Sequence, residues 1–144
     1  MRTMLSGPGR VLLPALLLLP GAAGCGKGLY PVHGKVTFED GKPFTNGMVV
    51  FESAEGPKPV TARGDLQSDG SYQLSTNKPG DGVPAGKYRV LVSPRVDISA
   101  DAPERNLSVD KRYTEFATSG LQFEVKPGPN DFPIQVSRPG KMRR

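Results

Sequence analysis

The sequence predicts an all-β fold, an antiparallel seven-stranded β-sandwich that follows an N-terminal signal peptide. Apolar and polar residues alternate with a period of two in short segments of the chain, which is the pattern of half-buried strands. Turn dipeptides such as Asp40-Gly41 and Asp69-Gly70 separate these segments. Beyond residue 24 there is no helical period, so we expect two sheets packed around one core.

The first two strands differ in their pattern. Residues 32–39 place Val32, Val36 and Phe38 on one face of a strand and polar side chains on the other. Residues 48–51 are apolar on both faces, which is typical of a strand in the middle of a sheet.

Five further segments complete the predicted sandwich. Pro133 has no N–H to donate, so the last strand is expected at a sheet edge. Residues 77–86 are rich in glycine and proline and predict a loop. The five segments are residues 60–66, 71–74, 88–93, 121–125 and 132–136. The predicted core comprises Val36, Phe38, Val50, Leu66, Tyr72, Leu74, Tyr88, Val90, Val92, Leu121, Phe123 and Ile134.

The N-terminus has the three zones of a secretory signal peptide. Residues 1–10 carry two arginines, residues 11–19 are apolar, and residues 20–24 are mostly small. The apolar run is too short for a membrane-spanning helix, which needs about 20 residues. We therefore assign residues 1–24 to a signal peptide.

The only cysteine, Cys25, directly follows this segment and cannot form an internal disulfide. It is either a free thiol or a site of lipidation. Ala-Ala-Gly-Cys at residues 22–25 resembles a bacterial lipobox, in which the cysteine receives a diacylglycerol, and we favour lipidation. The mature chain then has 120 residues, enough for one domain. We divide it into a short tether (25–31), a β-sandwich domain (32–137) and a basic tail (138–144).

The net charge of +5 does not indicate nucleic-acid binding. Residues 25–137 hold 13 basic and 14 acidic side chains, a net charge of −1. The positive charge lies in the signal peptide and in the tail, so a basic groove through the domain is not expected. The tail either contacts anionic lipid or is frayed.

Residues 94–119 show no periodicity and exceed the usual length of a loop. Their charges are dense but balanced, so the segment is either disordered or draped over the surface, or a binding loop. As a binding loop it would use Arg95, Arg105, Arg112 and Tyr113. Tyr113 and Tyr30 are the tyrosines expected outside the core, where a ring can stack on a sugar.

The order of these segments resembles a family of small bacterial lipoproteins with a transthyretin-like, carboxypeptidase regulatory-like sandwich. The similar stretches are residues 32–37, 40–43, 46–51, 69–76, 80–90, 113, 118–121 and 125–130. The resemblance implies an envelope-anchored domain without catalytic residues. Where members of that family tend to have a proline before Ala-Thr-Ser-Gly-Leu, this chain has Phe116.

The sequence offers little for catalysis or metal binding. His33 is the only histidine, and it is expected to point outward from its strand without acting as a general base. Zinc sites need several His or Cys ligands. Asp65, Asp69 and Asp81 suggest calcium, but turn chemistry explains them equally well, so no metal or cofactor is expected. The C-terminus also lacks the Tyr-Arg-Gly-Ser of transthyretin-like purine-pathway hydrolases.

The sequence thus predicts a lipid-anchored, non-catalytic domain of the cell envelope that acts as a structural or protein-interaction module. The alternative is a lipoprotein that binds a small ligand or a glycan through residues 94–119. Gly26 after the cysteine lacks an acidic retention signal, which favours the outer over the inner membrane. The expected partners are the membrane, through Cys25, and an envelope protein or glycan, but no nucleic acid.

Overall fold

A computed structural model of the chain describes residues 28–95 and 108–140. The predicted signal peptide, Cys25 and residues 141–144 of the tail lie outside the described residues. So do residues 96–107. Within the described parts the chain is all-β, apart from one short 3-10 helix, η2 (Lys111–Thr114).

The first sheet is antiparallel throughout and has four strands in the order β4-β3-β7-β8. The strands are β3 (Gly47–Ser53), β4 (Thr61–Asp65), β7 (Gly86–Pro94) and β8 (Leu121–Val125). The central position predicted for residues 48–51 is confirmed, because β3 pairs with β4 on one side and β7 on the other.

The second sheet is built around β2 (Val32–Phe38), and its pairing is mixed. β5 (Ser71–Gln73) pairs antiparallel with β2, whereas β9 (Asn130–Asp131) and β10 (Ile134–Val136) pair with it in parallel. The prediction of a wholly antiparallel sandwich was therefore wrong for these two strands. Alternation specifies which face of a strand is buried but not its direction, so the sequence pattern could not reveal this pairing. β10 lies at the sheet edge, as expected from Pro133.

A third, two-stranded pairing joins β1 (Leu29–Tyr30) to β6 (Val83–Pro84). Both strands fall in segments predicted to have no regular structure, the tether at 25–31 and the loop at 77–86. The described end of the predicted tether is thus part of the folded domain. Two-residue strands are too short to show a period, which is why the sequence did not reveal them.

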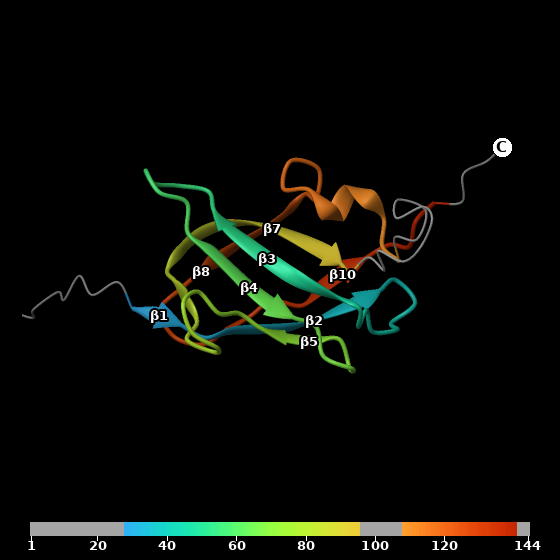
Figure 1. Cartoon of the computed structure of the whole chain (residues 1–144), viewed down its shortest axis with the longest axis horizontal. Helices are drawn as coiled ribbons and strands as arrows, with labels where there is room; N and C mark the ends of the chain where they lie inside the picture. The colour runs from blue at the N-terminus through green and yellow to red at the C-terminus, as the bar shows by residue number, and fades with distance from the viewer. Residues whose placement is uncertain (1–27, 96–107, 141–144) are drawn as a thin grey trace, which may run out of the picture.

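The side chains of all three pairings meet in one core, an arrangement consistent with a β-sandwich (Figure 1). Eight of the twelve predicted core residues are buried, and Leu66, Leu121 and Phe123 pack partly buried against them. The prediction of Val50 as a core residue was wrong, since Val49 and Phe51 on β3 are fully buried and Val50 faces outward, half-buried. The core residues that the sequence did not predict are Val32, Phe44, Val49, Phe51, Ala62, Val83, Val109, Tyr113, Val125 and Val136.

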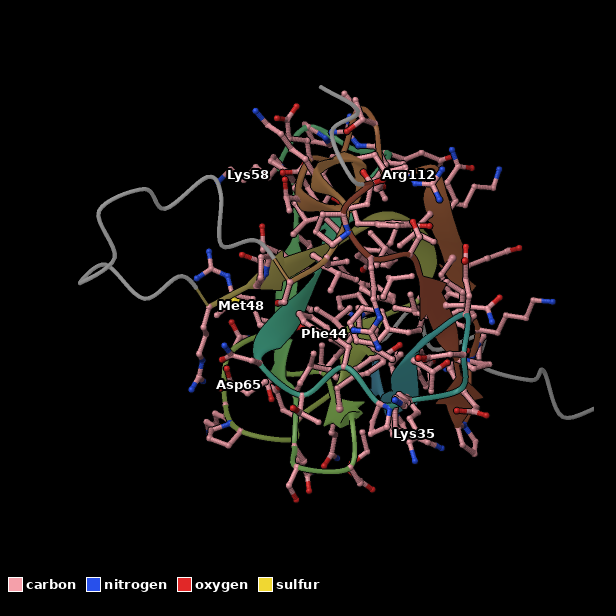
Figure 2. All side chains as sticks on the ribbon, turned by 90° about the vertical axis from the view of Figure 1, so that its right-hand side faces the viewer. Lys35, Phe44, Met48, Lys58, Asp65 and Arg112 are labelled. Carbon is pink, nitrogen blue, oxygen red and sulfur yellow. The ribbon has the colours of Figure 1, made fainter. Side chains whose placement is uncertain are left out.

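Aromatic rings form the contact between the two larger sheets. Phe51 on β3 lies about 6 Å from the rings of Tyr88, Phe123 and Phe132. The last two rings stack with their centroids 4.4 Å apart, which joins β8 to the segment before β10. Figure 2 shows Phe44 between the layers, and its ring packs edge-on against that of Phe38 with the centroids 5.6 Å apart.

Candidate functional site

The described parts of segment 94–119 are packed against the domain. Pro94 ends β7, and the segment resumes at Ser108 and contains η2. Val109 is fully buried and Tyr113 is only 7% exposed. The expectation of a disordered loop is therefore wrong for residues 108–119, which lie over the domain with Val109, Tyr113 and Ser119 buried, and residues 96–107 lie outside the described part.

Three polar contacts fix this segment. The buried Ser119 hydroxyl donates to the Val90 carbonyl at 2.6 Å, next to the point where β8 begins to pair with β7. The Asp110 backbone N–H donates to the Ser137 carbonyl at 2.9 Å, which joins the segment to the end of β10. The Asp110 carboxylate caps η2 by accepting from the Arg112 N–H. Residues 108–119 thus bridge the two sheets.

Tyr113 does not form the exposed sugar platform that the sequence suggested. Its ring points into the core, and the Arg112 guanidinium lies over the ring at 4.6 Å from its centroid. The same guanidinium donates to the Tyr113 hydroxyl and, at 3.3 Å, to that of Ser137. A ring covered on one side by core and on the other by arginine offers no free face to a sugar.

The structure does not bring the other predicted loop residues together either. Arg95 pairs with Asp65 on β4 at 2.8 Å, and its backbone exchanges hydrogen bonds with Asn46. Figure 2 shows Asp65 and Arg112 on different sides of the molecule. Arg105 lies outside the described residues. Arg95, Arg112 and Tyr113 therefore each serve the fold and do not line a common site.

The residues considered for chemistry are also separate. His33 is exposed on β2, as expected, opposite Gln73 of β5. Over residues 28–95 and 108–140, no three His, Cys, Asp or Glu side chains lie close enough together to hold a metal ion. Asp65 binds Arg95, Asp69 accepts from the N–H and hydroxyl of Ser71, and Asp81 has three backbone donors of its own.

A polar groove that sequence reasoning missed lies where the two larger sheets meet. Arg63 on β4 and Ser75, just after β5, exchange both backbone hydrogen bonds, at 2.9 and 2.8 Å. These strands lie side by side at the lower front of Figure 1. Beside this junction is a shallow depression of about 520 Å³, bordered by β4, β5 and residues 75–79. We call it the β4–β5 groove.

Gly64 permits the close approach of strands that forms the groove. A Cβ atom at this position would lie 2.6 Å from the Gln73 carbonyl oxygen, which is closer than real atoms come. The glycine is therefore required by the neighbouring backbone and not by an unusual φ angle. A glycine inside a strand pattern is the sequence signal for such an approach. Gly64 is therefore the residue from which the sequence could have indicated this groove.

Asp81 holds the loop at the side of the groove in a fixed shape. One carboxylate oxygen accepts the N–H of Thr76 at 2.7 Å, and the other accepts those of Asn77 and Lys78 at 3.0 and 2.9 Å. These bonds to the charged form, with that to Thr76 the largest cause, lower the pKa of Asp81 below its ordinary value. The negatively charged carboxylate of Asp81 thus holds the backbone of residues 76–78 in place.

Comparison of the chain with protein-family models, curated proteins and solved structures gives no match. No helix in the described part of the chain has the length and apolar character to cross a bilayer. The described residues form an all-β domain of several mainly antiparallel sheets.

Proposed function

We propose that this protein is a lipid-anchored, non-catalytic domain of the cell envelope that acts as a structural or protein-interaction module, with a transthyretin-like sandwich. The observation that carries the proposal is the place of Cys25, directly after small residues and just before the fold begins. Only Gly26, Lys27 and Gly28 separate it from β1. Three residues reach about 10 Å when extended, so a lipidated Cys25 would hold the domain against the membrane surface.

This anchor gives the domain an orientation. β1 and the described C-terminal residues lie at opposite ends of the long axis (Figure 1). Arg138, the first residue of the basic tail, stacks on Phe38 at 3.8 Å and pairs with Asp40 at 3.1 Å. We infer that this part of the tail binds the domain at the end away from the membrane, which favours neither of the roles considered for it, lipid contact or fraying.

The outer surface of the first sheet is where we place a protein partner. Val50 and Leu91 are cross-strand neighbours there, and Met48 lies two residues before Val50 on the same face of β3. All three are half-buried, and the ion pairs Arg89–Glu52 and Arg95–Asp65 flank them. An apolar centre with a charged rim is typical of the middle of a protein interface.

Two experiments test the proposal. Radiolabelled fatty acid should be incorporated into the wild type and not into Cys25→Ala, and equal labelling would overturn the lipid anchor. Crosslinking of intact envelopes should recover a partner with the wild type that is lost with Val50→Arg. Gln135→Arg, on the exposed face of β10, is the matched control and should retain the partner.

The alternative function is ligand or glycan binding. Segment 94–119 supports it less than expected, because Tyr113 is buried and Arg95 and Arg112 have partners within the domain. The observation that favours this alternative is the β4–β5 groove.

A further inference from the structure

We propose that the β4–β5 groove binds an anionic saccharide, a sugar that carries a carboxylate or a phosphate. Arg63 and Lys78 would neutralise the acidic group, and the surrounding amide and hydroxyl side chains would bind the sugar hydroxyls. The inference concerns a surface of the folded domain and does not depend on a lipid anchor.

Strand pairing places the lining residues on one surface. Because Arg63 pairs with Ser75, the alternation of the two strands brings Asp65 next to Gln73 on the same side. All four residues line the groove, whereas their chain neighbours Ala62, Gly64, Tyr72 and Leu74 are buried. The two sheets thus present one continuous polar surface here.

The charges of the groove select an anion. Arg63 and Lys78 both line it and are exposed, and neither forms an ion pair with a described residue. The carboxylate of Asp65 is bound by the Arg95 guanidinium at 2.8 Å, at the rim. Two cations therefore face the groove, while its one acid already has a partner.

The neutral lining suits a sugar. Gln67, Gln73 and Asn77 each offer an amide N–H₂ donor and a carbonyl acceptor, the combination that neighbouring hydroxyl groups require. The Ser75 hydroxyl accepts from the Gly80 N–H at 2.8 Å and keeps its own proton to donate. A volume of about 520 Å³ is within the usual range of small-ligand sites.

The site is also rigid before any ligand binds. Asp81 fixes the backbone of residues 76–78 by three hydrogen bonds, and the Thr76 hydroxyl donates to the Gly82 carbonyl at 2.7 Å. A loop already held in place loses little entropy on binding.

The same features disfavour a peptide ligand. An extended peptide binds by adding to a free strand edge, but here the N–H and C=O of Arg63, in the middle of β4, are already bonded to Ser75. Pro79 is the single apolar side chain that lines the groove, so there is no pocket for the apolar or aromatic anchor that protein ligands use. No aromatic ring lines the groove, so the affinity must rest on charge and depend on salt.

In the experiment, each probe is titrated into the purified full-length protein. Binding is monitored by calorimetry and by backbone amide NMR. The probes are trigalacturonate for the carboxylate class, glucose 6-phosphate for the phosphate class, and maltotriose as the neutral control. Inorganic phosphate and a hexaglutamate peptide complete the set. The variant Arg63→Gln/Lys78→Gln removes both cations, and Lys58→Gln removes an exposed lysine that does not line the groove.

We expect at least one anionic sugar to bind, to shift the amides of residues 63, 73 and 75–78, and to weaken about tenfold in the double variant. Binding should be unchanged in Lys58→Gln and should fall between ionic strengths of about 0.01 and 0.15 M. The proposal would be overturned if the double variant bound the anionic sugars as tightly as the wild type does. It would also be overturned if neither anionic sugar bound to the wild type, or if inorganic phosphate or hexaglutamate bound more tightly than the sugars. Equal melting temperatures of the variants would show that they remain folded.

Discussion

Single aspartates hold the turns of this protein, and they do so as charged acceptors. Asp40 accepts from the Lys42 N–H, Asp69 from the N–H and hydroxyl of Ser71, and Asp81 from three successive N–H groups. These bonds lower the pKa of each carboxyl below its ordinary value of 3.8. The free energy of unfolding that they contribute is therefore present above pH 4 or so, and is lost as the pH falls through the lowered pKa values.

Asp81→Asn tests this at the most strongly bonded of the three turns. The amide is a weaker acceptor and one side of it is a donor, so the variant should unfold at a lower urea concentration at neutral pH. The difference from wild type should shrink on acidification, when the wild-type carboxyl also loses its charge. Glu39→Gln, at an exposed site, serves as the control. A difference independent of pH would contradict the assignment.

Tyr72 is a second residue whose role is testable. Its buried hydroxyl donates to the Phe132 carbonyl at 2.6 Å, and burial, more than the nearby Asp131, raises its pKa. Tyr72→Phe should lower the free energy of unfolding by about 1–2 kcal/mol, because the carbonyl loses its donor.

Gly34→Ala should cost more than Tyr72→Phe in the same denaturant titration, since its Cβ would lie 2.1 Å from that carbonyl oxygen. If Gly34→Ala proves neutral, the close approach between β2 and residue 132 is incorrect.

At the level of elements, the segment at residues 108–119 depends on Ser119. Its hydroxyl donates to Val90 and accepts from the Leu121 N–H at 3.2 Å, so it joins the start of β8 to β7. Ser119→Ala should reduce the free energy of unfolding by about 1–3 kcal/mol. It should also speed limited proteolysis within residues 108–118, whereas Thr114→Ala, at a less buried hydroxyl, should do so much less. Equal cleavage rates in the two variants would contradict this role.

The sequence predicted elements better than their partners. All seven expected strands exist, because alternation and turn dipeptides are local signals. The parallel direction of β9 and β10, the inward face of β3 and the burial of Tyr113 depend on which elements meet, and no local pattern carries that information. The β4–β5 groove was missed for the same reason. Arg63 and Lys78 lie on separate segments of the chain, and neither belongs to a local sequence motif that would indicate a binding site.

For the whole molecule, the proposed anchor makes a prediction about height above the bilayer. The loop that contains Lys58 lies at the same end as β1, and β10, the strand of Gln135, lies towards the opposite end. In liposomes that contain the lipidated protein and a quencher lipid, a fluorophore at residue 58 should be quenched more than one at residue 135. Similar quenching at both sites would mean that the domain lies flat on the surface.

The parallel pairing of β10 with β2 has a mechanical consequence. β2 follows the proposed anchor and β10 is the last strand of the described residues, so two strands from opposite ends of the domain's sequence are neighbours that run in the same direction. A pull between the proposed anchor and the C-terminal end of the domain would slide these strands past each other lengthwise. All hydrogen bonds between them would then be loaded together and not opened one by one, so the domain should resist tension along its long axis.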